Sequence, residues 1–254
     1  MPMSLPDRSL KTITNRIVGW LHRKLLTSDK KGFIVGVSGG VDSAVVALLA
    51  RQAGLVLTMI LPCESSPQSI RLAENFVKKF SLPYRKIDLT GIYQNLLKLY
   101  GEPVGNGEDS RIARANLKAR LRMITLYYFA NRYNYLVLGT GNKSELSIGY
   151  FTKYGDGGVD LLPIGDLYKT DVWRLARYLK VPARIIQQAP SAGLWKGQTD
   201  EKEMGLPYKI LDEILSLKER KKEIPINLKK YLAKITQKMA LARHKLQPAR
   251  KCLL

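Results

Sequence analysis

Short apolar runs alternate with amphipathic stretches along most of the chain. Such runs, rich in β-branched side chains, are typical of buried parallel strands, and the longer stretches carry apolar residues at helical spacing. Strands that alternate with helices favour a parallel sheet covered on both faces, so the expected fold class is α/β, doubly wound. Strands are predicted at 33–37, 56–61, 84–89 and 135–138, and helices at 8–27, 41–50, 68–80, 110–133 and 171–179, with one more around 96–99.

The segments after these elements are less regular. Residues 101–107 are predicted to be a flexible connection, and residues 149–169 are rich in glycine and aspartate but fit no regular element. The stretch 191–207 combines glycines and prolines with a charged middle, so we interpret it as a mobile lid, because long loops in compact domains tend to be functional. Two basic helices, at about 207–222 and 226–245, are expected to form a C-terminal helical region over 207–254.

Composition narrows the class of protein. The chain has 254 residues and a formal net charge of +21, which favours phosphorylated or polyanionic partners, although solvated helix faces in the C-terminal region also account for part of it. We expect a single domain over residues 1–254, without a membrane span. Cys63 and Cys252 are far apart, and Met1–Asp7 lacks the layout of a secretory signal, so a cytoplasmic location is expected.

The segment Ser38–Ser43, with sequence Ser-Gly-Gly-Val-Asp-Ser, follows the first predicted strand and opens a helix. Its two glycines let the backbone approach an anion, and the first free N–H groups of the helix point at that anion. The segment is not a Walker A loop, because no Gly-Lys-Ser/Thr follows, and it is not Gly-x-Gly-x-x-Gly either. A plainer interpretation is a glycine turn capped by Ser38, with Asp42 favoured by the helix dipole.

The Ser38–Ser43 segment resembles the loop of the ATP pyrophosphatases, which cleave ATP between its α- and β-phosphates. Further motifs make the resemblance more specific, and the chain is similar over residues 32–247 to the NAD synthetases that use ammonia and lack a glutaminase domain. These motifs are Asn116–Arg120, Gly139–Glu145, Gly149–Asp160, Leu167–Thr170, Pro190–Leu194 and His244-Lys245.

The resemblance implies an ATP-dependent amidation. ATP activates the nicotinate carboxylate of deamido-NAD as an adenylate, pyrophosphate leaves, and ammonia then displaces AMP. The fold would be that of the adenine nucleotide α-hydrolases with extra C-terminal helices. The partners would be ATP, deamido-NAD and ammonia, together with a second copy of the chain, since the family is homodimeric. Neither a membrane nor a nucleic acid is expected as a partner, despite the basic charge.

The resemblance also assigns residues to the ATP site. Asp42 and Glu145 would hold Mg²⁺, which prefers carboxylate and phosphate oxygens. Lys169 would bring a fixed positive charge to the phosphates, and Asp156 would help to deprotonate the ammonium. Helix or turn capping is the alternative for Thr140 and Ser191. The predicted ATP-binding residues are Gly36, Val37, Ser38, Gly39, Gly40, Val41, Asp42, Ser43, Thr140, Lys169 and Ser191.

The residues that fall where the family binds deamido-NAD are Arg120, Lys153, Asp160, His244 and Lys245. Basic groups are expected there, because this substrate carries its own pyrophosphate. Taken alone, Arg120 and His244 could be ordinary surface residues, and Asp156 and Asp160 could form turns.

Two other functions remain open from the sequence. A related loop enzyme that adenylates a tRNA base would suit the basic charge, although no RNA-binding module is recognisable. The chain could also be a basic binding protein that kept a nucleotide pocket without catalysis. The simultaneous presence of Asp42, Glu145, Lys169 and Lys153 argues against the second possibility, because a binding protein has no chemical need for all four.

Overall fold

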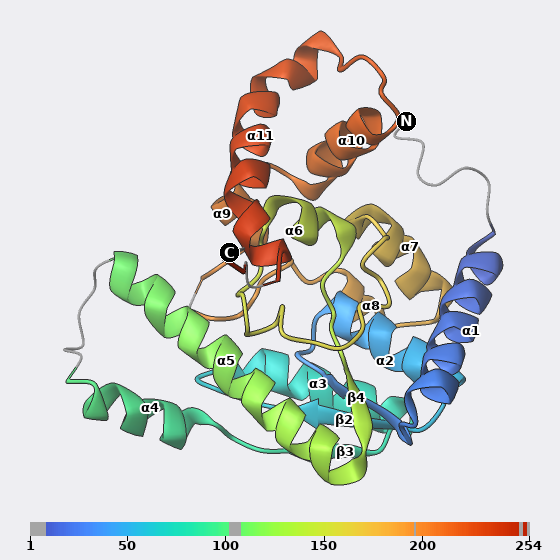
Figure 1. The fold of residues 1–254 in the computed structure, drawn as a ribbon, viewed down its shortest axis with the longest axis vertical. Coiled ribbons are helices and arrows are strands. Elements are labelled where there is room, and N and C mark those ends of the chain that lie inside the picture. The colour runs from blue at the N-terminus through green and yellow to red at the C-terminus, as the bar shows by residue number, and fades with distance from the viewer. Residues whose placement is uncertain (1–8, 102–107, 196, 249–250, 253–254) are drawn as a thin grey trace.

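The computed structural model describes residues 9–101, 108–195, 197–248 and 251–252. A parallel sheet with the strand order β3-β2-β1-β4 lies at its centre (Figure 1). The predicted strands are confirmed, although the last residues predicted for β3 only continue its backbone hydrogen bonds, from Ile87 N to Ile60 O and from Leu89 N to Pro62 O. The strands are β1 (Gly32–Gly36), β2 (Val56–Ile60), β3 (Tyr84–Lys86) and β4 (Tyr135–Leu138).

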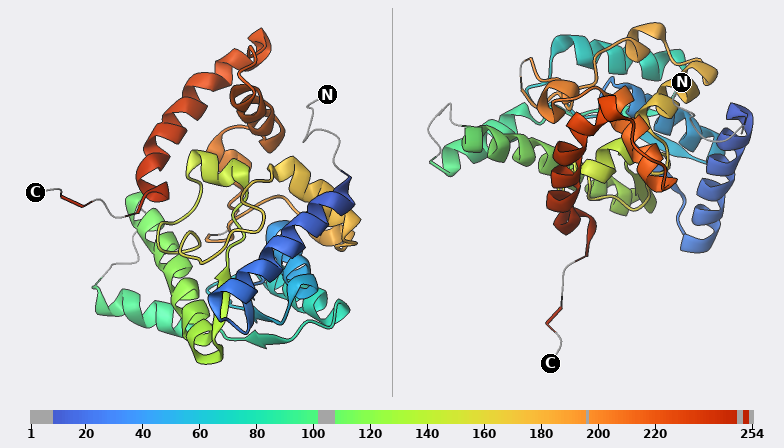
Figure 2. Two further views of the ribbon diagram at one scale, coloured as in Figure 1. Left: turned by 45° about the vertical axis from the view of Figure 1, so that its right-hand side comes forward. Right: turned by 90° about the horizontal axis from the view of Figure 1, so that it is seen from above.

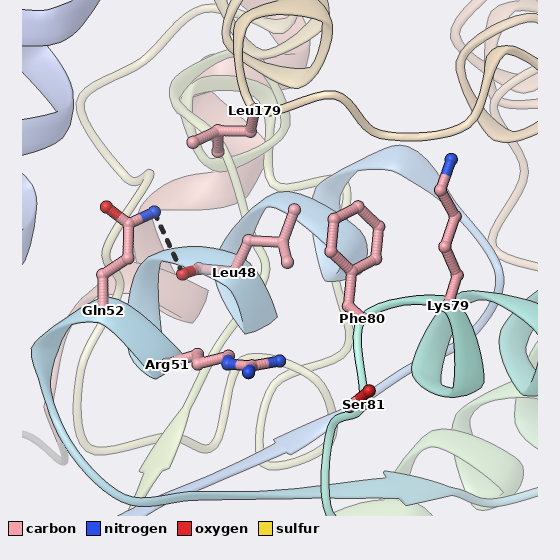
Figure 3. A pocket seen from close by; sticks show the side chains of 7 residues that line it. All are labelled: Leu48, Arg51, Gln52, Lys79, Phe80, Ser81 and Leu179. Carbon is pink, nitrogen blue, oxygen red and sulfur yellow. Dashed lines mark hydrogen bonds between the residues drawn. The ribbon is translucent and has the colours of Figure 1, made fainter.

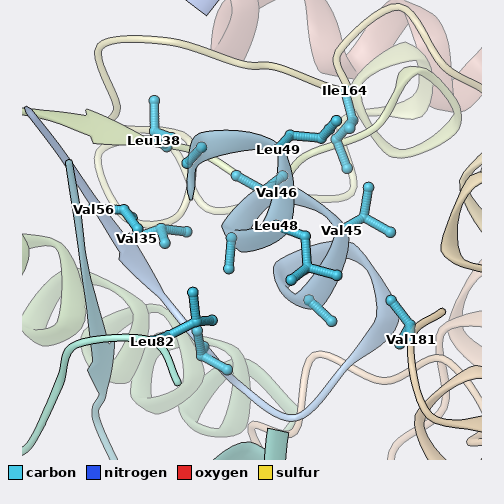
Figure 4. Close-up of a cluster of buried hydrophobic side chains, with 14 of the residues drawn as sticks. Val35, Val45, Val46, Leu48, Leu49, Val56, Leu82, Leu138, Ile164 and Val181 are labelled. Atoms are coloured by element: carbon cyan, nitrogen blue, oxygen red, sulfur yellow. The ribbon is translucent and has the colours of Figure 1, made fainter. Parts of the chain in front are cut away.

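Helices cover both faces of the sheet, as the doubly wound prediction requires. Side chains alternate along β1, so that Phe33 and Val35 join one hydrophobic cluster and Ile34 joins another on the opposite face. Figure 4 shows part of the first cluster, which surrounds α2. It involves α1 (Leu10–Ser28), α2 (Val41–Ala53), α3 (Pro67–Lys79) and α7 (Lys169–Tyr178), whereas the second involves α4 (Thr90–Leu99) and α5 (Glu108–Tyr133).

The leading helix α1 belongs to the core of the same chain. It packs against α2 and α7, and its Leu21 is fully buried in the first cluster. Of the predicted connection 101–107, all but Gly101 lies outside the described residues.

The C-terminal helices lie beside the sheet, as Figure 2 shows from two sides, and their apolar side chains belong to a third hydrophobic cluster. The basic helices predicted from the sequence are present, and many of their lysines, including Lys229, Lys230 and Lys234, are exposed. Three short helices were not predicted, because they span few residues and show little periodicity. The elements of this region are α6 (Lys143–Ile148), α8 (Ala183–Ile186), α9 (Asp200–Met204), α10 (Tyr208–Glu219) and α11 (Ile226–Leu246), and the three short ones are α6, α8 and α9.

A surface hollow of about 560 Å³ lies beside the C-terminal half of α2, at the end of that helix away from Asp42. It is lined by Leu48, Arg51 and Phe80 among others (Figure 3).

In the part of the chain that the structure describes, each helix is too short or too polar to cross a lipid bilayer.

Candidate active site

The candidate site lies at the carboxyl ends of β1 and β4, which are neighbours in the sheet. From β1 the chain continues to β2 on one side, whereas β4 pairs with β1 on the other side. The gap between β1 and β4 is therefore the topological switch point, where ligands bind in open α/β sheets. This arrangement brings the Ser38–Ser43 loop next to the Thr140–Glu145 segment, although the two are far apart in sequence.

The Ser38–Ser43 loop is held in one shape by its own serines. The amide of Ser38 donates to Ser43 Oγ at 3.2 Å, and Ser43 Oγ donates to the carbonyl of Gly40 at 2.9 Å. Gly39 has a φ of +89°, and a Cβ there would lie 2.5 Å from the carbonyl oxygen of Ser69, so only glycine fits. Gly40 is the N-cap of α2 and offers no capping side chain, which leaves the first N–H groups of that helix available to an anion.

Lys169 connects the two carboxylates that the sequence assigned to the metal. Its Nζ lies 2.6 Å from Asp42 Oδ2 and 3.1 Å from Glu145 Oε1. The lysine side chain is 2% exposed, whereas the carboxylates keep 17% and 14% exposure. The structure thus brings three residues from α2, α6 and α7 into one ionic cluster, hereafter the Lys169 cluster.

Two residues that the sequence analysis did not single out contact the carboxylates of this cluster. Asn142 Nδ2 donates to Asp42 Oδ1 at 2.9 Å, and the hydroxyl of Tyr208 lies 3.1 Å from Glu145 Oε1. Asn142 is also the N-cap of α6 and forms a reciprocal capping box with Glu145. The Asn-x-x-Glu spacing predicts that cap from the sequence, whereas no local sequence pattern predicts that Tyr208 contacts Glu145.

Burial changes the proton affinity of the cluster. Desolvation, together with the nearby charges of Asp42 and Asp200, raises the pKa of Glu145 to about 7, although Lys169 opposes the shift. Burial by itself would favour the neutral amine of Lys169, but Asp42 and Glu145 outweigh it and raise the pKa of this lysine. The ammonium therefore stays charged at neutral pH, as a partner for phosphate oxygens must.

The basic residues predicted for deamido-NAD gather around the segment 149–153. The Arg120 guanidinium donates to the carbonyl of Lys153 at 3.3 Å, and Lys153 Nζ donates to the carbonyl of His244 at 2.6 Å. Lys245 Nζ donates to the carbonyls of Gly149 and Phe151, both at 2.8 Å. Gly149 has a φ of +68°, and a Cβ there would lie 2.5 Å from the Cβ of Ala242, so only glycine lets α11 approach α6 so closely.

The hydrogen bonds of Asp156, Asp160 and Ser191 involve residues outside the Lys169 cluster. Asp156 Oδ1 accepts a hydrogen bond from the Thr152 amide at 2.9 Å, and Asp160 Oδ2 accepts one from the Val137 amide at 2.7 Å. Neither carboxylate has a hydrogen bond to the cluster among the described residues, so both currently serve turns and strand ends. Thr140 is the second residue after β4, and Ser191 Oγ accepts a hydrogen bond from the Gly193 amide at 3.1 Å.

Comparison with known proteins decides the family. The profile of the NAD synthase family matches residues 13–249. The NH3-dependent NAD(+) synthetase of Carboxydothermus hydrogenoformans is 52% identical over 80% of this chain and 84% of its own length. The chain belongs to the NAD synthase family.

Solved structures agree with this membership of the NAD synthase family. The NMN synthetase of Francisella tularensis superposes with a TM-score of 0.89 at 35% identity, covering 98% of this chain and all of its own. The NH3-dependent NAD synthetase of Campylobacter jejuni, solved in complex with the nitrate ion, has a TM-score of 0.80 at 28% identity over 97% of this chain. The α/β fold with its C-terminal helices is therefore that of NAD synthetase structures.

Proposed function

We propose that this protein is an ammonia-dependent ligase of NAD biosynthesis that amidates deamido-NAD to NAD with the consumption of ATP. The observation that carries the proposal is the Lys169 cluster at the β1–β4 switch point, where the Ser38–Ser43 loop leads into α2 with its first N–H groups uncapped by a side chain. The chain also matches most of the length of two relatives named NH3-dependent NAD(+) synthetase. One is 52% identical over 84% of its own length, and the other is 44% identical over 93% of its own length.

The residues of the site suit the two half-reactions. In the first, the nicotinate carboxylate attacks the α-phosphorus of ATP, and negative charge grows on the phosphate oxygens and on the leaving pyrophosphate. The N–H groups at the start of α2 and the ammonium of Lys169 are fixed donors for that charge. In the second half-reaction ammonia attacks the activated carbonyl and AMP leaves. Binding both substrates side by side supplies much of the rate, so no covalent nucleophile is required.

Asp42 and Glu145 would hold Mg²⁺. In the described part of the chain no group of three or more histidine, cysteine, aspartate or glutamate side chains is arranged to hold a metal. Two carboxylates fit the way Mg²⁺ binds in nucleotide enzymes, where substrate phosphates and waters complete the octahedron. When bound, the metal would neutralise charge on the phosphates.

We also propose that the active form is a homodimer. Helix α5 exposes two apolar side chains one turn apart that the rest of the described chain leaves uncovered, with exposed fractions of 58% for Ile124 and 59% for Tyr128. A self-complementary apolar face is typical of a two-fold interface. Light scattering at assay concentration should give twice the chain mass, and a monomer would contradict the proposal.

The decisive experiment is a coupled assay with ATP, Mg²⁺, ammonium and purified protein. Deamido-NAD and nicotinate mononucleotide should be compared, because the Francisella tularensis relative is named an NMN synthetase. We expect ammonium-dependent NAD formation, with a higher kcat/KM for the dinucleotide. A preference for the mononucleotide would move the assignment to NMN synthesis, and no pyrophosphate release with either substrate would overturn the ligase assignment.

The substitution Lys153→Ala is expected to impair the use of deamido-NAD more than the use of ATP. Lys153 belongs to the basic group around residues 149–153, not to the Lys169 cluster, and its Nζ is also bound to the end of α11. Loss of one ammonium contact to a substrate phosphate costs about 1.5–3 kcal/mol, so KM for deamido-NAD should rise about 10- to 100-fold. Steady-state kinetics with each substrate varied in turn would check this. Equal changes in both KM values would contradict the assignment.

Metal binding is expected to depend on pH through Glu145. Its pKa of about 7 means that the carboxyl is mostly neutral at pH 6 and mostly ionised at pH 8, and a metal competes with the proton. The affinity for Mn²⁺, measured with a non-hydrolysable ATP analogue present, should therefore fall from pH 8 to pH 6. The variant Glu145→Gln should bind Mn²⁺ more weakly and lose this part of the pH dependence. A wild-type affinity that is flat between pH 6 and pH 8 would show that Glu145 does not titrate there.

A further inference from the structure

The loop that carries Ser191 is held by hydrogen bonds to Asp200, Gln198 and Lys118. We define the Ser191 loop as residues 190–195. The amide of Asp200 donates to the carbonyl of Pro190 at 2.9 Å, and Asp200 Oδ1 accepts from the amide of Ala192 at 3.1 Å. Both neighbours of Ser191 are thus bound to Asp200. Lys118 Nζ donates to the carbonyl of Leu194 at 3.0 Å and holds the far end of the loop.

Asp200 is itself held by two tyrosines. The carboxylate residue is 4% exposed, and the hydroxyls of Tyr150 and Tyr208 donate to Oδ1 and Oδ2 at 3.0 and 2.9 Å. With the Ala192 amide, three neutral donors surround it. A buried carboxylate is costly to retain unless its hydrogen bonds are satisfied, so its place between the loop and two phenols needs an explanation beyond packing.

Tyr208 connects Asp200 to the Lys169 cluster. Its side chain is fully buried, and its hydroxyl lies between Asp200 Oδ2 and Glu145 Oε1, at 2.9 and 3.1 Å. Its ring centroid lies 4.9 Å from Lys169 Nζ, within cation–π distance. The ring also packs edge-on against Trp173 at 6.1 Å between centroids, which fixes its orientation. One side chain therefore contacts Glu145, Lys169 and Asp200.

We propose that Tyr208 and Asp200 are positioning residues that couple the Ser191 loop to Glu145. The contacts form an unbroken path from Ala192 through Asp200 and Tyr208 to a carboxylate oxygen of Glu145. Nucleotide that orders the Ser191 loop then also fixes the metal ligand, so that the metal binds well only beside a correctly seated nucleotide. This inference rests on the proposed function, in which Ser191 contacts ATP and Glu145 holds the metal.

The test compares Tyr208→Phe with Asp200→Asn. Phenylalanine keeps the ring and removes only the hydroxyl between the two carboxylates. Asparagine keeps a single acceptor oxygen, so it can no longer accept hydrogen bonds from both the Ala192 amide and the Tyr208 hydroxyl. Nucleotide affinity is measured by titration calorimetry with α,β-methylene-ATP, and metal affinity by the electron paramagnetic resonance signal of free Mn²⁺ with the analogue at saturation.

We expect Tyr208→Phe to weaken Mn²⁺ binding about 10-fold, as loss of a partner to a metal-binding carboxylate does, while analogue affinity without metal stays unchanged. Asp200→Asn should weaken both, and the double variant should bind Mn²⁺ no more weakly than Asp200→Asn alone, because the two residues lie on one path. Unchanged Mn²⁺ affinity in folded Tyr208→Phe would overturn the proposal. If Tyr208→Phe does not fold, Asp200→Asn becomes the deciding variant. Wild-type affinities of Asp200→Asn for the ATP analogue and for Mn²⁺ would then overturn the proposal.

Tyr168→Phe is the matched control. Tyr168 is also largely buried, and its hydroxyl donates to Glu219 Oε2 at 2.8 Å, away from Asp200 and Glu145. A purely structural role for Tyr208 would make the two tyrosine variants alike, with a lower melting temperature and wild-type affinities. If the wild-type protein binds neither the analogue nor Mn²⁺, the proposed function itself fails, and this outcome is distinct from a failure of the coupling.

Discussion

The substitution Asp42→Asn is expected to abolish most turnover in a protein that still folds. Asp42 presents Oδ2 to Lys169 and Oδ1 to Asn142, and it belongs to the Ser38–Ser43 loop itself. A metal held at this position contributes several kcal/mol to transition-state stabilisation, so its loss should lower kcat by at least about 100-fold. The coupled assay, run at saturating ATP and deamido-NAD, measures this directly.

Asp166→Asn is a suitable control for Asp42→Asn. Asp166 also pairs with a lysine, Lys143, at 3.1 Å, but its side chain is 93% exposed, and the pair lies outside the Lys169 cluster. Its substitution removes the same charge and should leave kcat near the wild-type value. Turnover of Asp42→Asn within a few-fold of wild type would remove Asp42 from the metal site.

The second large effect is expected for Lys169→Met, on both stability and activity. Methionine fills a similar volume but leaves Asp42 and Glu145 next to each other without the ammonium that bridges them. Breaking a buried ion pair from one side costs about 3–5 kcal/mol, and this much should be lost from the free energy of unfolding at pH 8 without metal. Urea denaturation measures that loss, and kcat should fall as well, because a fixed charge for the phosphates is gone.

The pH dependence of the Lys169→Met penalty follows from Glu145. The folded-state pKa of this carboxyl is raised, to about 7, so the folded protein retains a proton there that the unfolded chain has already lost. The resulting destabilisation grows as pH rises from the unfolded value near 4.5 to about 7 and is constant above. Because Lys169 lowers the pKa of Glu145, its removal should raise that pKa further. At pH 6 the carboxyl is then mostly neutral, so Lys169→Met should regain part of the stability that it loses at pH 8. Mn²⁺ should also restore stability at pH 8, since it replaces the missing positive charge.

Lys143→Met is the matched control for stability. Lys143 pairs with Asp166 and Glu219, whose side chains are 93% and 56% exposed, so its removal should cost less than about 1 kcal/mol. If Lys169→Met were as stable as Lys143→Met at pH 8, the Lys169 cluster would contribute little to the stability of the fold.

The sequence alone was sufficient for the strand–loop–helix unit around the Ser38–Ser43 segment. The apolar run 33–37, the glycines of the Ser38–Ser43 segment and the helix after them are local features, and local hydrogen bonding and backbone preferences determine them. The family motifs then assigned Asp42, Glu145 and Lys169 to one site, and the structure brings these three side chains into contact. Whether they hold a metal and ATP stays a prediction.

Only the tertiary structure could reveal how that site is held. The strand order places β4 beside β1, which brings Asn142 to Asp42, and the packing of α10 against α6 and α7 buries Tyr208 between Glu145 and Asp200. These contacts join residues that lie far apart in the chain, so no local periodicity or cap encodes them. The 191–207 segment illustrates the difference. Its composition predicted a mobile lid, which stays a prediction, and only the structure shows that Lys118 of α5 donates to the carbonyl of Leu194 and that Tyr208 of α10 donates to Asp200.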